Sequence, residues 1–193
     1  DKIHYFAKLD STMLEAKRCI LSKQSCPRLI VAGEQSQGKG RFGRIWFAPK
    51  GNLYLTLVQP AKHSIDQIPI IVGMAVAEVL MQLISSHQPD AHQNNTTGIV
   101  TLKHPNDVLI DGKKICGILI EKWDDLYSVG VGINVASSPV IQDYETTYMQ
   151  HYNPTITVGF LLRCFLRRYQ SLLQADFRTM LLLHPFSRYA QEN

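Results

Sequence analysis

The chain has 193 residues, of which 45% are hydrophobic and 19% charged, and its formal net charge is +4. This length predicts one domain, and the composition is that of a globular protein without internal repeats or low-complexity tracts. The mild positive charge suits either an enzyme for anionic substrates or a weak nucleic-acid binder, and charge alone does not decide between them.

The cysteines and the apolar stretches both indicate a cytoplasmic protein. The four cysteines include no CxxC pair, and none has a histidine nearby at zinc-ligand spacing, so we expect reduced, buried thiols. The first residues lack the apolar stretch of a signal peptide, so we expect none. The longest apolar stretch, 68–84, is interrupted by a proline, a glycine and polar residues, which favours a buried core helix over a membrane span.

Helices are expected near both ends and in the middle of the chain. Apolar residues at helical spacing predict them after the capping sequence at 10–12, over 68–84, over 157–177 and, as a short final helix, from Phe186. Pro27 is expected to end the first helix. The polar stretch 85–97 is expected to be an exposed loop.

Strands are expected mainly between these helices, over 28–32, 52–59, 98–103, 108–110, 114–122 and 126–135. Asp111-Gly112 lies between two of them and predicts a type I′ hairpin turn. Because strands and helices do not alternate regularly, we predict an α+β fold: a mixed, largely antiparallel sheet with helices on one side.

A glycine-rich loop joins the first two predicted strands. Residues 38–43 match GxGxxG, but the following stretch contains a proline, a glycine and many β-forming residues, which argues against the helix that a dinucleotide site requires. No Walker Gly-Lys-Ser/Thr follows either. The loop places Lys39, Arg41 and Arg44 on a flexible backbone that suits a phosphate or carboxylate, and the alternative is a solvated basic loop.

Two further segments contain candidate ligand-binding residues. The sequence KHPND over 103–107 lies between two predicted strands, and the next strand contains Lys114 and Gly117. A glycine within an apolar strand marks the close approach of a ligand or another backbone, and regular alternation predicts that Lys114 and Cys116 share one face. The sequence GVGIN over 130–134 again places two glycines in a strand, and it ends in an asparagine that could bind an adenine edge.

In this order and at these separations, the motifs resemble the catalytic domain of biotin protein ligases. The matching stretches are DST from Asp10, Gln35, GKGRFGRIW from Gly38, NLYLT from Asn52, KHPND from Lys103, KICGILIE from Lys114 and GVGIN from Gly130. The resemblance implies the fold shared by class II aminoacyl-tRNA synthetases and biotin synthetases. It covers the chain to about residue 135, and the rest matches only as a generic helical segment.

The resemblance also implies roles for individual residues. Biotin is expected to contact Ser11, Thr12, Gln35, Lys39, Gly40, Arg41, Lys114 and Gly117. The nucleotide is expected to contact Arg44, Trp46, Lys103 and Asn134, with Asp107 as a ligand of Mg²⁺. Catalysis is expected from Lys114, Arg41 and Lys103, because two anions must meet and cations must screen them.

The reaction that the resemblance implies uses biotin and ATP with its Mg²⁺. The biotin carboxylate attacks the α-phosphorus, and the resulting biotinyl-5′-AMP acylates a lysine of a biotin carboxyl carrier protein, that of acetyl-CoA carboxylase or a related enzyme. A homodimer is a possible assembly. We expect one catalytic domain over 1–193, with neither an N-terminal DNA-binding domain nor a C-terminal β-barrel domain, and therefore no DNA binding.

The chain departs from the family pattern at Lys39, His104 and Met13, where arginine, tryptophan and asparagine are usual. One alternative is a lipoate or octanoate ligase or transferase of the same fold, although the Arg-Arg and Gly-Gly signature of those enzymes is absent. Another is a non-catalytic nucleic-acid-binding domain that uses the basic loop, although no aromatic RNA-binding pattern or recognition helix supports it.

Overall fold

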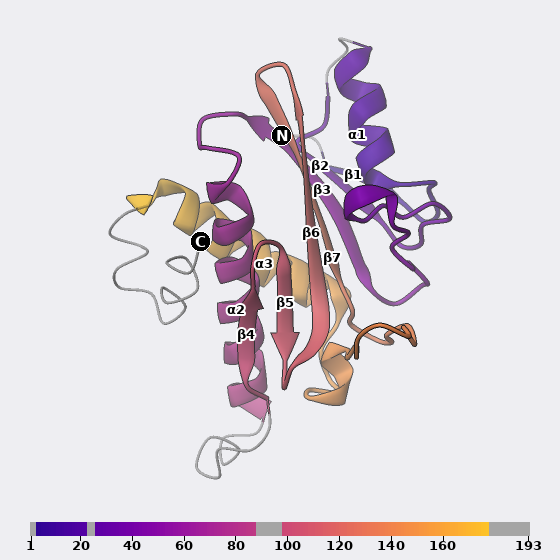
Figure 1. Cartoon of the computed structure of the whole chain (residues 1–193), viewed down its shortest axis with the longest axis vertical. Coiled ribbons are helices and arrows are strands. Elements are labelled where there is room, and N and C mark those ends of the chain that lie inside the picture. Colours follow the sequence, from indigo (N-terminus) through magenta and orange to yellow (C-terminus); the bar gives the residue numbers. More distant parts are fainter. Residues whose placement is uncertain (1–2, 23–25, 88–97, 178–193) are drawn as a thin grey trace.

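The computed structural model describes residues 3–22, 26–87 and 98–177 (Figure 1). Within them, a seven-stranded sheet has the order β1-β2-β3-β7-β6-β5-β4. Only β1 and β2 run parallel, and the other neighbouring pairs are antiparallel, which confirms the predicted mixed sheet. The strands are β1 (Ile3–Phe6), β2 (Leu29–Ala32), β3 (Leu53–Pro60), β4 (Val100–Lys103), β5 (Asp107–Ile110), β6 (Lys113–Trp123) and β7 (Leu126–Ile133).

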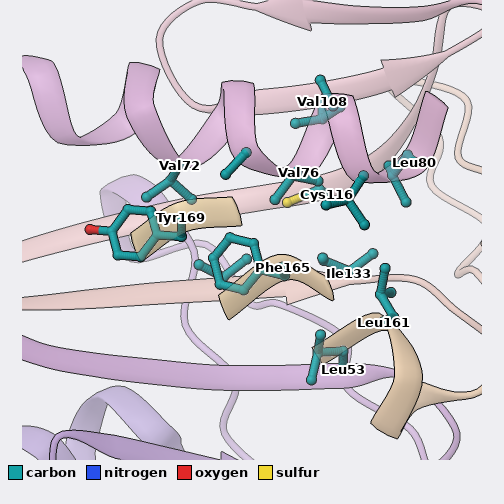
Figure 2. Close-up of a cluster of buried hydrophobic side chains, with 14 of the residues drawn as sticks. Leu53, Val72, Val76, Leu80, Val108, Cys116, Ile133, Leu161, Phe165 and Tyr169 are labelled. Atoms are coloured by element: carbon teal, nitrogen blue, oxygen red, sulfur yellow. The ribbon is translucent and has the colours of Figure 1, made fainter. Parts of the chain in front are cut away.

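Two helices, α2 (Gln67–His87) and α3 (Val158–Gln174), build the main core on one face of the sheet. Figure 2 shows side chains of both helices packed against those of β3, β5, β6 and β7. By length and composition α2 could span a membrane, but 67% of its apolar window is buried within the protein. It is therefore placed as the core helix that its sequence predicts.

Helix α1 (Thr12–Leu21) lies on the opposite face of the sheet from α2 (Figure 1). Its Ala16 packs with Ile30 and Val58, whereas the neighbours of Ile30 in β2 pack into the α2–α3 core. The prediction of helices on one side only was wrong at this point. All of β2 is buried, so each of its faces requires a covering element.

The element boundaries differ from prediction in three places. Strand β1 was not predicted, because it is a half-exposed edge strand of only four residues. Helix α1 ends at Leu21, before Pro27, and α2 continues to His87, so residues 85–87 are helical and not loop. The remainder of the expected loop and the helix expected from Phe186 lie outside the described residues.

The hairpin between β5 and β6 contains a bulge that sets the direction of Lys114. The turn residues Asp111 and Gly112 have φ values of 51° and 77°, as the predicted type I′ turn requires. Val108 pairs with Cys116 but Leu109 pairs with Lys114, so Ile115 is an extra residue on β6. Lys114 therefore shares a face with Asp107, and the prediction that it shares one with Cys116 was wrong.

Candidate active site

A pocket of about 820 Å³, open to solvent, lies on the face of the sheet that α1 covers. Its walls come from the start of α1, the glycine loop, β6, β7 and the segment after β7. It brings together most of the predicted site residues: Ser11, Thr12, Gln35, Lys39, Gly40, Arg41, Arg44, Trp46, Asp107, Lys114 and Gly117.

The start of α1 supplies the polar end of the pocket. The Gln35 side-chain oxygen accepts hydrogen bonds from the Thr12 backbone N–H (2.7 Å) and the Thr12 hydroxyl (3.1 Å). The Ser11 hydroxyl is buried and has no hydrogen-bond partner in the described part of the chain. A buried polar atom of this kind is normally satisfied, so Ser11 is suited to a ligand with an oxygen or N–H group.

An ion pair anchors this end of the helix. The Arg18 guanidinium donates to both oxygens of Asp10, at 2.7 and 2.9 Å, and these bonds lower the pKa of Asp10 to about 2. Asp10 also accepts a hydrogen bond from the Ser11 backbone N–H. The DST sequence therefore fixes the helix start through Asp10 and presents Ser11 and Thr12 to the pocket.

The glycine loop forms a narrow hairpin at the pocket mouth. Gly40 N–H donates to the Arg44 carbonyl (2.8 Å), and Trp46 N–H donates to the Gly38 carbonyl (2.9 Å). Its tip is the short 3-10 turn η1 (Arg41–Gly43). These bonds leave the Lys39, Arg41 and Arg44 side chains at the pocket, where they are available for an anion.

Asn106 connects this loop to the sheet. Arg41 donates to the Asn106 side-chain oxygen at 2.8 Å, and the Asn106 amide nitrogen donates to the Ile118 carbonyl at 3.1 Å. Asn106 was not among the predicted site residues. Its place in the KHPND sequence, directly before Asp107, was the available signal.

The Trp46 ring lies against the strand glycines, where the sequence predicts a close contact. A Cβ atom on Gly117 would lie 2.6 Å from the Trp46 ring, and one on Gly132 would lie 2.7 Å from it. Gly130 gives the same room to Met13, at 2.7 Å. The glycines of β6 and β7 therefore seat an indole and a thioether, and the indole N–H is buried with no hydrogen-bond partner among the described residues.

Lys114 lies at the centre of the charged end of the pocket. Its ammonium is 2.8 Å from an Asp107 carboxylate oxygen. It is also 5.5 Å from the centroid of the Trp46 ring and 5.4 Å from that of Tyr144, both within the range of cation–π attraction. Tyr144 was not predicted, because it belongs to the segment after residue 135 that carries no family motif.

Two predicted residues, Lys103 and Asn134, do not line this pocket. Lys103 lines a smaller adjacent hollow between α2 and the turn at 104–106. Asn134 is buried, and its amide nitrogen donates to the Thr147 carbonyl at 3.0 Å, while its side-chain oxygen has no partner in the described structure. No group of three histidine, cysteine, aspartate or glutamate side chains gathers to hold a metal within the described ranges, and Asp107 as a magnesium ligand stays a prediction.

Cys116 takes no part in the pocket. It is fully buried in the α2–α3 core, and burial raises the pKa of its thiol far above the ordinary value. A thiol held protonated in an apolar core is a poor nucleophile. Cys116 therefore fits the expectation of a reduced, buried thiol.

Comparison with known proteins gives consistent matches. Residues 5–135 match the model of the biotin/lipoate A/B protein ligase family. The chain is 30% identical to the bifunctional ligase/repressor BirA of Bacillus subtilis, over 93% of this chain and 57% of that protein. It is 33% identical to the biotin–[acetyl-CoA-carboxylase] ligase of Paracoccus denitrificans, over 69% of this chain and 54% of that protein. The chain thus spans little more than half the length of these relatives.

A solved structure agrees in fold. The biotin protein ligase of Aquifex aeolicus, in complex with biotin and ATP, superposes with a TM-score of 0.74 at 26% identity, covering 93% of this chain and 75% of that one. The predicted synthetase-like fold is therefore confirmed. Since the family model matches more than half of the sequence, from β1 to the end of β7, the chain belongs to the biotin/lipoate A/B protein ligase family.

Proposed function

We propose that the chain catalyses ATP-dependent protein biotinylation: it forms biotinyl-5′-AMP and transfers the biotinyl group to a lysine of a biotin carboxyl carrier protein. One observation carries the proposal. A single pocket has a polar end at the buried Ser11 and Thr12 and the half-buried Gln35, and a cationic end at Lys114 and Arg41. Biotin has the matching polarity, with a neutral ureido ring at one end and a carboxylate at the other.

The first step requires that two anions meet. The biotin carboxylate oxygen forms a bond to the α-phosphorus of ATP, and pyrophosphate leaves with the electrons of the broken P–O bond. We propose that Lys114 and Arg41 screen the charges of the carboxylate and the α-phosphate, because both line the pocket beside the glycines of β6 and β7. Fixed cations at the position where charge develops are the main protein contribution to such a transfer.

The second step releases AMP. The neutral ε-amine of the acceptor lysine attacks the acyl carbon of the mixed anhydride, an amide forms, and the amine loses a proton. The glycine loop at the pocket mouth is suited to exclude water from the anhydride before this attack. The acceptor must then approach from the open side of the pocket.

For the nucleotide, Arg44 and Trp46 are the proposed contacts within the pocket, and Lys103 is proposed to reach the triphosphate from the adjacent hollow. ATP brings its Mg²⁺, for which Asp107 is the proposed carboxylate. Asn134 is buried outside the pocket, so a contact from its unpartnered oxygen to adenine would require the segment after β7 to shift.

A carrier protein partner, a homodimer and a cytoplasmic location belong to the same proposal.

Titration calorimetry of biotin, with and without a non-hydrolysable ATP analogue, tests the proposal. We predict that the wild type binds biotin and that Lys114→Ala weakens binding about tenfold or more, because the bond from an ammonium to a carboxylate contributes roughly 1.5–3 kcal/mol. The neighbouring Lys113 pairs with Glu145 and does not line the pocket, so Lys113→Ala should bind normally.

Lipoate and nucleic acid are titrated in the same way. Binding of lipoate but not biotin would replace the proposal by the lipoate alternative. Binding of neither acid, with salt-sensitive binding of an oligonucleotide, would favour the nucleic-acid alternative.

A further inference from the structure

The segment after β7 returns to the pocket and pairs with the bulge in β6. Lys114 N–H donates to the Glu145 carbonyl, and the Lys114 carbonyl accepts from Thr147 N–H, both at 2.9 Å. Thr146 forms a parallel bridge with Lys114, and its hydroxyl donates to the Pro139 carbonyl. Residues 145–147 therefore pair with β6 through a single β-bridge at Lys114.

This pairing determines where Tyr144 lies. Directly before the paired residues, Tyr144 brings its ring to 5.4 Å from the Lys114 ammonium and into the pocket wall. On the exposed side, the Lys113–Glu145 ion pair at 3.1 Å joins the same two segments. This ion pair is exposed and contributes little, so the backbone hydrogen bonds of Lys114 are what hold the Tyr144 ring beside it.

We propose that Tyr144 is a positioning residue for Lys114 in the adenylation step, an inference that rests on the proposed function and deepens it. A lysine side chain has many rotamers, and its ammonium must point at the reacting carboxylate and phosphate. The Tyr144 and Trp46 rings attract the ammonium through their π faces. They carry no net charge, so they hold the cation without neutralising it.

Asp107 differs from the rings in this respect. Its carboxylate pairs with Lys114 at 2.8 Å, and a substrate carboxylate or phosphate competes with it for the same ammonium. When the substrate anions become the partners of Lys114, the two rings are the contacts that can persist. Tyr144 is therefore expected to affect the rate of the chemical step more than the binding of ATP.

Single-turnover formation of biotinyl-5′-AMP tests this in the full chain. Tyr144→Phe keeps the ring and should react like the wild type. Tyr144→Leu keeps an apolar side chain without the π face, and should lower the rate at saturating substrates about fivefold to tenfold with little change in the KM for ATP. Val140→Ala is the matched control, because Val140 is fully exposed in the same segment.

A second measurement does not depend on turnover. Acetylation of Lys114 by a limiting reagent, read by mass spectrometry relative to Lys113, should be faster in Tyr144→Leu than in Tyr144→Phe, because the ammonium loses a contact that shields and orients it. The proposal would be overturned if wild type, Tyr144→Phe and Tyr144→Leu had the same adenylation rate and the same labelling rate. It would also be overturned if Tyr144→Phe formed the adenylate as slowly as Tyr144→Leu. A wild type that forms no adenylate would instead contradict the proposed function, while the labelling would still test the positioning.

Discussion

At the residue scale, the pocket depends on positions where a side chain is absent. Gly117 and Gly132 face each other across β6 and β7, and their missing Cβ atoms leave the space that the Trp46 ring occupies. The sequence predicts that a ligand or another backbone closely approaches such glycines. It does not predict that the group is the chain's own indole, because Trp46 is far from both strands along the chain.

We predict that Gly132→Ala moves Trp46 and damages the site. The new methyl group would lie 2.7 Å from the ring, and overpacking of this kind costs about 1–3 kcal/mol. Urea unfolding should show the loss of stability, and calorimetry should show weaker binding of biotin with the ATP analogue. In α3, Gly159 has its nearest neighbour at 3.7 Å, so Gly159→Ala should be neutral or stabilising. Wild-type stability and affinity in Gly132→Ala would contradict this account.

At the element scale, the glycine loop is held by few bonds. Besides its own hairpin bonds and the packing of Trp46 against β6 and β7, it is tied to the sheet by the side-chain hydrogen bond of Arg41 to Asn106. A loop with so few external contacts is expected to open locally at a low cost in free energy. Its basic residues were predictable from sequence, but the partner of Arg41 was not, because the contact spans 65 positions.

We predict that Asn106→Ala makes the loop more accessible to trypsin. The hydrogen bond from a charged donor contributes roughly 1.5–3 kcal/mol, so cleavage after Arg41 and Arg44 should become at least about tenfold faster under native conditions. Arg163 and Arg167 lie in α3 and serve as internal controls whose cleavage should not change. Equal acceleration at all four sites would indicate global destabilisation, and unchanged cleavage at the loop would mean that Asn106 does not restrain it.

At the scale of the whole molecule, strand order assembles the site. The start of α1, the glycine loop, β6, β7 and the segment after β7 are distant in sequence, and they meet because β3, β7, β6 and β5 are neighbours. Local patterns sufficed to predict every strand except β1, and the family motifs sufficed to predict half of the residues that line the pocket. They did not predict the bulge at Ile115, the side on which α1 packs or the approach of Tyr144, since each depends on pairing between remote segments. A single catalytic domain over 1–193 without DNA binding stays a prediction.

The contribution of the Asp10–Arg18 pair to the free energy of global unfolding should decrease as the pH falls. The pKa of Asp10 is about 2 in the folded chain against 3.8 for the free side chain. Because the folded value is the lower one, the pair stabilises the fold above about pH 4, and this contribution disappears as the pH falls toward 2. Since the Arg18 side chain is 50% exposed, solvent screening limits the contribution to about 1 kcal/mol at most.

We therefore predict that Asp10→Asn, which keeps an oxygen for the Ser11 N–H, lowers the free energy of unfolding by up to about 1 kcal/mol at pH 7 and by about half as much at pH 3. Urea titrations at a series of pH values measure the difference between the two proteins. Arg18→Met should lose at least the same amount, and adding Asp10→Asn to it should cost little more, because the pair is already broken. A difference between wild type and Asp10→Asn that stays constant from pH 7 to pH 3 would show that ionisation of Asp10 is not what stabilises the start of α1.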